Sequence, residues 1–155
     1  MLNMVLYEPT KFELEILDFW AKKNIYEKQK KLYANSKKQW SFIDGPITAS
    51  QLSGMGVHHA WGRMLKDIYL RWHAMQRYNL RRQNGFDTQG LWIKREIEKE
   101  LGFKRGKKDI EEYGIGKFVE KCEAHVQKAA AKITEQSIRY GHWMDWDNSY
   151  YTHTD

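Results

Sequence analysis

The sequence predicts an α/β fold in which parallel strands alternate with flanking helices, and three observations predict it. An apolar run at residues 40–43 is cut off by Gly45 and Pro46, which is typical of a short buried strand. Apolar residues then recur with a helical period over residues 61–75. A second strand is expected at residues 79–83, ended by Asn84 and Gly85, and another helix follows it. This order of elements favours a parallel sheet covered by helices.

The helix after the first strand has the clearest pattern. Its apolar residues are spaced as one buried face, made of Trp61, Met64, Leu65, Ile68, Trp72 and Met75. We expect this face, including Trp61, Trp72 and Met75, to pack in the core without contacting a ligand.

Helices are also expected near both ends of the chain. Thr10 and Glu13 have the spacing of a capping box after Pro9, and Ile16, Leu17 and Trp20 would lay that helix against the sheet. The helix after the second strand has Ile93, Ile97 and Leu101 on one side. A long helix is expected from Gly116 to about Tyr140, ended by Gly141, with an apolar face of Val119, Cys122, Val126, Ala130 and Ile133. Beyond it, Asp145, Asp147 and Asn148 are interpreted as turn residues.

Chemically useful residues fall at the ends of these elements. His58 and His59 follow a loop containing Gly56, at the helix start, where unpaired N–H groups and the helix dipole attract phosphates. Asp87 follows the second strand, where a carboxylate can hold an ammonium group. A substrate with a phosphate at one end and an amine at the other fits this combination, and an aminoacyl adenylate is such a molecule.

Simpler interpretations of the same residues remain open. Two histidines at a helix start often only cap it or lie in solvent, Gly45-Pro46 can be a plain turn, and Asp87 can cap the next helix. Cys122 and His125 lie on one helical face but make half a zinc site at best, so no structural metal is predicted.

At these positions the sequence resembles the class I aminoacyl-tRNA synthetases of the leucyl, isoleucyl and valyl group. The Gly-Pro loop of that family, which lines the amino-acid pocket, corresponds to Gly45-Pro46-Ile47-Thr48-Ala49-Ser50. Its His-x-Gly-His signature corresponds to Gly56-Val57-His58-His59, and its Gly-Trp-Asp-x-His-Gly-Leu motif to Gly85-Phe86-Asp87-Thr88-Gln89-Gly90-Leu91. The order and spacing of these motifs extend the resemblance over essentially the whole chain.

The resemblance assigns roles to individual residues. His59 matches the second signature histidine, which binds the ATP phosphates and stabilises the adenylation transition state. Gly56 replaces the first signature histidine, and His58 stands where the family has glycine and is a second candidate donor. Asp87 keeps the carboxylate that holds the substrate's α-amino group, whereas Gln89 replaces a histidine.

The implied fold is Rossmann-like, and the implied activity is ATP-dependent activation of leucine, isoleucine or valine and its ligation to tRNA. Magnesium would accompany ATP through phosphate oxygens and water. Gln89 and Trp92 depart from the isoleucyl and valyl pattern, which leaves leucine at least as well supported.

Residues 1–155 are expected to form one domain, the N-terminal half of a synthetase catalytic domain. The editing and anticodon-binding domains and the half with the Lys-Met-Ser-Lys-Ser loop are expected to be absent, so the chain alone would be a weak or inactive catalyst. The alternative is a non-catalytic module that binds tRNA or a synthetase partner. A nucleotidyltransferase for another substrate class is disfavoured by Asp87.

Composition agrees with these expectations. The 155 residues suffice for one domain with a core, and the formal net charge of +6 suits a nucleic-acid partner. A single cysteine excludes an internal disulfide framework. No apolar run is long enough for a membrane span or a signal peptide, so the expected compartment is the cytoplasm.

Overall fold

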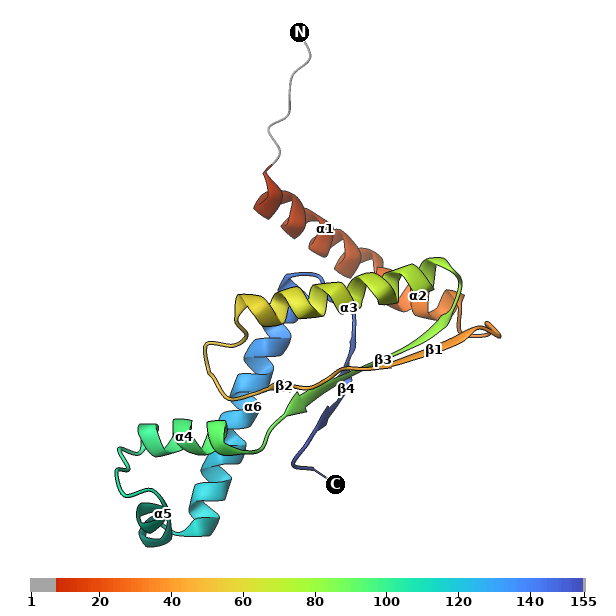
Figure 1. Ribbon diagram of the computed structural model, residues 1–155. Coiled ribbons are helices and arrows are strands. Elements are labelled where there is room, and N and C mark those ends of the chain that lie inside the picture. The colour runs from red at the N-terminus through yellow and green to blue at the C-terminus, as the bar shows by residue number, and fades with distance from the viewer. Residues whose placement is uncertain (1–7, 155) are drawn as a thin grey trace.

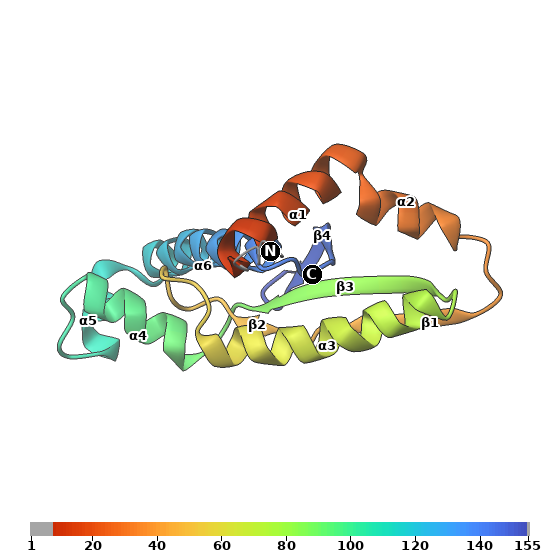
Figure 2. The same cartoon turned by 90° about the horizontal axis from the view of Figure 1, so that it is seen from above.

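The computed structural model describes residues 8–154, in which six helices surround a four-stranded sheet (Figure 1). The elements in chain order are α1 (Pro9–Lys23), α2 (Ile25–Leu32), β1 (Gln39–Ile43), β2 (Ile47–Thr48), α3 (Val57–Met75), β3 (Asn79–Asp87), α4 (Leu91–Glu100), α5 (Lys107–Tyr113), α6 (Ile115–Arg139) and β4 (Asp145–Tyr151). Figure 2 shows β3 running between α3 on one side and α1 and α2 on the other. The predicted α/β fold with parallel strands is confirmed.

Strand β3 is the centre of the sheet, and every pairing is parallel. β1 pairs with its first half, from Gln39 opposite Asn79, and β2 pairs with its end, with Ile47 opposite Phe86. The expected end of this strand at Asn84 and Gly85 is wrong, because β2 and β4 continue its hydrogen-bonded ladder to Asp87. Gly85 is required there: a Cβ atom would overlap the ring of Tyr150 on β4.

The sequence correctly predicts the position of β1, but the prediction that this strand is buried is wrong. Trp40 is 43% exposed and Ile43 is 58% exposed. β1 pairs only with β3 among the described strands, so it lies at an edge of the sheet rather than inside it.

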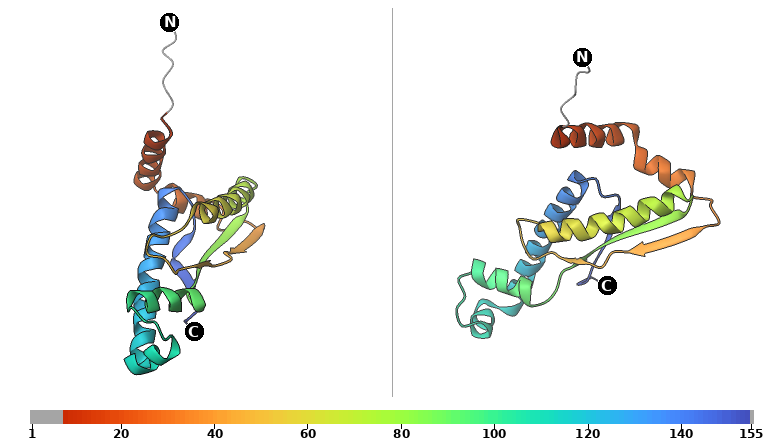
Figure 3. Two further views of the ribbon diagram at one scale, coloured as in Figure 1. Left: turned by 60° about the vertical axis from the view of Figure 1, so that its left-hand side comes forward. Right: turned by 45° about the horizontal axis from the view of Figure 1, so that its top comes forward.

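The main core lies between the end of the sheet and helices α4 and α6. Figure 3 shows α4 and α5 gathered at one end of α6, away from α1 and α2. The predicted inner faces of α4 and α6 are confirmed, although Val119 is exposed, and Gly141 follows the end of α6 with a φ of +87°. The buried cluster consists of Ile47, Ala49, Phe86, Ile93, Val126, Ala129, Ala130 and Ile133.

The predicted burial of the α3 apolar face is wrong. This face, Trp61, Met64, Leu65, Ile68, Trp72 and Met75, is exposed by 45% at Leu65 to 77% at Met75. The buried face of α3 is mostly polar instead and carries Arg63, Asp67, Leu70, His73 and Ala74. An ion pair and ring stacking explain this orientation, since Arg63 is paired with Asp44 and His73 stacks on Trp40 at a centroid distance of 3.8 Å.

Three expectations near the chain ends are also wrong. Pro9 is the first residue of α1 and Glu8 caps it without a side-chain hydrogen bond, so the Thr10 capping box does not form. Rather than lying on the sheet, α1 places Trp20 against Trp143, with ring centroids 4.8 Å apart. The residues expected as turns at Asp145, Asp147 and Asn148 belong to β4, because this segment pairs with β3.

A buried polar cluster beside α3 includes His142, which is 2% exposed. Neither of its ring nitrogens has a hydrogen-bond partner among residues 8–154. Burial is the main reason that the pKa of His142 falls to about 3, and the nearby cations Arg63, Arg71, Arg82 and Lys66 add to the effect.

We expect this histidine to make stability depend on pH. In the unfolded chain His142 binds a proton below its usual pKa of about 6.5. In the folded chain it does so only below about pH 3. The contribution of His142 to the free energy of unfolding is therefore fully present above about pH 6.5. As the pH decreases below about 6.5, this free energy falls by up to about 1.4 kcal/mol per pH unit. Urea unfolding of wild type and His142→Phe at pH 7 and pH 5 measures this, and the variant should lose less stability at pH 5. Equal losses would contradict the assignment.

Candidate functional site

The Asp44-Gly45-Pro46 turn joins β1 to β2 and is fixed by its first residue. The backbone N–H of Asp44 donates to the carbonyl of Gln83 on β3 at 2.8 Å. Its carboxylate, 1% exposed, lies 3.1 Å from Nη2 of Arg63 and 2.6 Å from Nζ of Lys66, both on α3. Gly45 and Pro46 themselves are exposed, so their backbone is accessible at the end of β1.

The loop before α3 is held by α6. Nε2 of His125 donates to the carbonyl of Ser50 at 2.8 Å. Gln136 makes two contacts, accepting from the N–H of Met55 at 2.8 Å and donating to the carbonyl of Ser53 at 3.0 Å. The long helix thus sets the position of the glycine-containing loop and of the first turn of α3.

His59 lies in that first turn and is half-buried. Its Nδ1 accepts a hydrogen bond from the backbone N–H of Gly56, the residue that caps α3, at 3.2 Å. In the neutral ring this places the proton on Nε2, which is then a donor. Burial, together with the neighbouring His58 and Arg63, lowers the pKa of His59 and favours this neutral form.

His58 is exposed, and its ring centroid lies 3.9 Å from that of His59. The interpretation of the pair as a helix cap is therefore correct for His59, but capping occupies only one of its ring nitrogens. The first turn of α3 also presents backbone N–H groups at the positive end of the helix dipole. Together these groups can bind an anion.

Asp87 closes β3, and its carboxylate is oriented from two sides. Oγ1 of Thr48 donates to Oδ2 at 2.7 Å, and the N–H of Gln89 lies 3.3 Å from Oδ1. Because Thr48 is its register partner on β2, the parallel pairing itself brings the two side chains together. The interpretation of Asp87 as a helix cap is wrong, since Gly90 is the N-cap of α4.

The pairing of β1 and β2 with β3 places the Gly45-Pro46 turn beside the last residues of β3, near Asp87, and α6 holds the loop that leads from β2 to the first turn of α3. Sequence patterns did not reveal the residues that position them, namely Arg63, Lys66, Thr48, His125 and Gln136. His125 contacts the loop through the carbonyl of Ser50. Residues 8–154 contain no group of three or more histidine, cysteine, aspartate or glutamate side chains placed to hold a metal ion.

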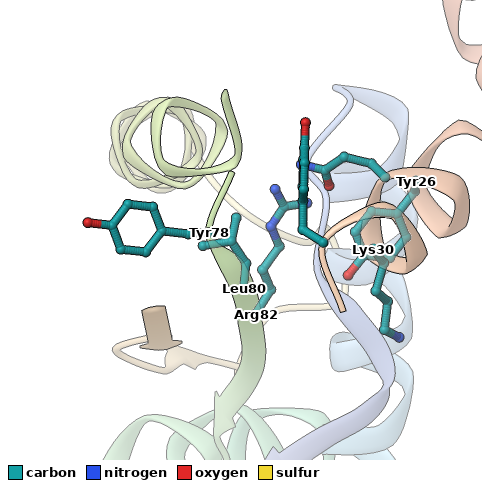
Figure 4. Close-up of a pocket in the computed structure, with 7 residues that line it drawn as sticks. Tyr26, Lys30, Tyr78, Leu80 and Arg82 are labelled. Carbon is teal, nitrogen blue, oxygen red and sulfur yellow. The ribbon is translucent and has the colours of Figure 1, made fainter. Parts of the chain in front are cut away.

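A separate small cavity lies at the opposite end of β3, between it and α2 (Figure 4). Its volume of about 10 Å³ is that of roughly one water molecule. Arg82 extends into it, with its guanidinium 5.5 Å from the Tyr26 ring and 5.7 Å from the Trp143 ring. These contacts attach α2 to the sheet, and the cavity is too small for a substrate.

Comparison with known proteins decides the family. Residues 15–155 match the family described as tRNA synthetases class I (I, L, M and V). The chain belongs to the class I tRNA synthetases. Its helices and parallel sheet are accordingly part of the Rossmann-like fold of that family.

Similar class I synthetases include the isoleucine–tRNA ligases of three archaeal species. Those of Methanothermobacter thermautotrophicus, Pyrococcus furiosus and Sulfolobus acidocaldarius are 42%, 40% and 36% identical to it over 147, 146 and 147 residues. Each match covers 94% of this chain and 13–14% of the relative. The chain therefore spans about one seventh of the length of these relatives. Within residues 8–154, none of the helices of this synthetase chain has the length and apolarity needed to span a membrane.

Proposed function

We propose that this chain carries the ATP- and amino-acid-binding residues of an aminoacyl-tRNA synthetase that activates a branched-chain aliphatic amino acid. The observation that carries the proposal is the arrangement of His59 at the start of α3 and Asp87 at the end of β3, in a chain of this family. Among leucine, isoleucine and valine, isoleucine is the first candidate because the relatives named above are isoleucine–tRNA ligases. Isoleucine-dependent ATP–pyrophosphate exchange tests this function.

In this proposal the amino-acid carboxylate attacks the α-phosphate of ATP and pyrophosphate leaves. Nε2–H of His59 donates to a phosphate oxygen, with the backbone N–H groups of the first turn of α3 beside it. A neutral imidazole with a fixed Nδ1 contact is oriented before ATP arrives, so little reorganisation is needed. The exposed His58 is a second donor to the same phosphates.

The amino acid lies at the end of the sheet. The carboxylate of Asp87, oriented by Thr48, accepts hydrogen bonds from the substrate ammonium group. The accessible backbone of Gly45 and Pro46 lines the pocket for the aliphatic side chain of the substrate. Such a pocket separates side chains that differ by one methylene by about 1–3 kcal/mol.

Magnesium and tRNA complete the reaction. Mg²⁺ arrives with ATP and is held mainly by phosphate oxygens and water. The aminoacyl group is then transferred to tRNA. The net charge of +6 favours association with its phosphates.

We further propose that the rest of a synthetase catalytic domain packs on the α3 apolar surface, defined as Trp61, Met64, Leu65, Ile68, Trp72 and Met75. An exposed apolar stripe of this length is typical of an interface. Beside it a cavity of about 760 Å³, lined largely by apolar atoms, extends to Trp40 and Phe42 on the edge strand β1. Without that second part, the chain is at most a weak catalyst.

Charged substitutions on this surface should remove the association. The chain is co-expressed with a tagged Methanothermobacter thermautotrophicus isoleucine–tRNA ligase from which the matched segment has been deleted, and co-purification is measured. The double variant Ile68→Lys, Trp72→Lys should reduce recovery at least about tenfold, because lysine ammonium groups resist burial in an apolar interface. Trp92→Lys on α4, where Trp92 is 71% exposed, is the control and should be recovered like wild type. Equal recovery of all three chains would contradict the proposed surface.

The alternative function is a non-catalytic module that binds tRNA or a synthetase partner, which the positive charge supports. Such a module binds tRNA with an affinity that falls steeply with salt, yet shows no amino-acid-dependent exchange. The two functions therefore give opposite results in the exchange assay.

A further inference from the structure

Asp44 connects three separate parts of the molecule from a fully buried position. Its carboxylate pairs with Arg63 and Lys66 of α3, at 3.1 Å and 2.6 Å. Its backbone N–H is bonded to Gln83 on β3, and its carbonyl accepts the hydroxyl of Tyr150 on β4 at 2.7 Å. Asp44 is also the residue directly before Gly45 and Pro46, so the turn begins at a fixed point.

Arg63 connects Asp44 to the start of α3. It lies four residues after His59, about one helical turn, so the two side chains emerge from the same side of the helix. Arg63 is 3% exposed and lowers the pKa of His59, which places the guanidinium within electrostatic range of the imidazole. The ion pair therefore fixes the rotation and the axial position of the first turn of α3 relative to the Asp44-Gly45-Pro46 turn.

We propose that Asp44 and Arg63 are positioning residues that set the spacing between the phosphate-binding histidine, His59, and the amino-acid-binding turn, Gly45-Pro46. This inference rests on the proposed function, in which ATP lies at the first site and the amino acid at the second. Neither carboxylate nor guanidinium contacts a substrate in this role. Their effect is on the geometry in which the amino-acid carboxylate meets the α-phosphate.

The energetics of the pair are consistent with such a role. Removing two charges from water costs most of what their attraction returns, so a buried ion pair contributes little net stability compared with apolar residues of the same volume. The effect of the pair on the reaction rate can be much larger than its effect on stability. A displacement of about 1 Å between two reacting groups lowers the rate by about 100-fold. A pair that stabilises little can therefore control the rate strongly.

The kinetic test compares Asp44→Asn with Ser137→Ala. Ser137 on α6 is the other partner of Arg63, 3.3 Å from Nη1, so its loss also leaves a buried guanidinium N–H unpaired but leaves the link to the turn intact. Both variants are assayed by isoleucine-dependent exchange, at a temperature where circular dichroism shows each to be folded. We expect Asp44→Asn to lower kcat about 10- to 100-fold with the KM values for ATP and isoleucine within about twofold of wild type. Ser137→Ala should retain both parameters.

Conservative replacement of the cation strengthens the test. Arg63→Lys keeps the charge but not the two-sided guanidinium, so it should retain more of kcat than Arg63→Met, while Lys66 still pairs with Asp44 in both and their losses should be smaller than that of Asp44→Asn. If Asp44→Asn merely lowers the melting temperature, with kcat of the folded protein unchanged, the positioning role is wrong.

A measurement without turnover separates this inference from the proposed function. Nuclear magnetic resonance of the His59 ring should show a shift in Asp44→Asn and none in Ser137→Ala. If wild type shows no exchange even when co-expressed with the ligase that lacks the matched segment, the proposed function fails, and the His59 resonance still decides whether the pair couples the two sites. An unchanged His59 resonance in Asp44→Asn would overturn the coupling.

Discussion

His59→Ala is expected to lower the rate of isoleucine-dependent ATP–pyrophosphate exchange by about 100- to 1,000-fold. Removing one preoriented donor from a site that stabilises developing negative charge has an effect of this size. The Nδ1 contact with Gly56 makes His59 such a donor, because it fixes the ring and leaves the proton on Nε2. The loss should appear in kcat more than in the KM for ATP, since the phosphate charge to be stabilised grows in the transition state.

Two comparison variants show whether the effect belongs to the phosphate site. His58→Ala should cost less than His59→Ala, because the exposed His58 ring is the secondary donor in the proposal. Lys107→Ala, at an 84% exposed side chain on α5, should change nothing. A His59→Ala variant with the wild-type rate would remove this histidine from the mechanism.

Asp87→Asn is expected to weaken isoleucine binding about 30-fold while ATP binding is retained. The asparagine keeps the shape of the side chain and an acceptor for the hydroxyl of Thr48, but it loses the charge that attracts the substrate ammonium. A hydrogen bond to a charged group contributes about 2 kcal/mol, and each 1.4 kcal/mol corresponds to a tenfold change in affinity. Isothermal titration calorimetry with isoleucine in the presence of a non-hydrolysable ATP analogue measures the change.

The matched control removes a carboxylate elsewhere. Asp18 lies on α1, where its side chain is 56% exposed and paired with Lys22. The affinity of Asp18→Asn for isoleucine should equal that of wild type. A ligand without the ammonium distinguishes the proposed contact from general damage: 3-methylpentanoate keeps the carboxylate and side chain of isoleucine and should bind Asp87→Asn and wild type equally. If isoleucine binds both variants equally, Asp87 does not hold the ammonium group.

Local patterns in the sequence were sufficient to predict the helices and their buried faces where the pattern lies within the helix itself. Ile93 and Ile97 repeat with a helical period and are buried in α4, and Val126, Ala130 and Ile133 do the same in α6. Gly141 ends α6 because it adopts a positive φ, a property that depends on the residue itself. The expected extent of the second strand was too short, since its last residues are strand only through pairing with β2 and β4.

Helix α3 shows where a local pattern stops being informative. The period correctly predicts an apolar stripe from Trp61 to Met75, but period alone does not say what covers a stripe. Arg63 and His73 determine which side of α3 is buried, because Arg63 forms an ion pair with Asp44 and the ring of His73 stacks on another ring. Polar residues at a helical spacing are usually assigned to solvent, so this face was missed.

The candidate site divides in the same way. The motifs around His59 and Asp87 could be recognised from order and spacing, and their roles stay predictions. The residues that hold them were not recognisable, because each contact joins positions far apart in the chain. Thr48 meets Asp87 across 39 residues, and Met55 meets Gln136 across 81 residues. Only the folded chain brings such partners together.

ATP–pyrophosphate exchange with the purified chain, supplied in turn with isoleucine, leucine and valine, separates an enzyme from a binding module. We expect slow exchange that requires one of these amino acids, is fastest with isoleucine, and disappears in His59→Ala. Exchange no faster than in the absence of amino acid, combined with tRNA binding that weakens steeply with salt, would contradict the proposed function and establish the chain as a binding module.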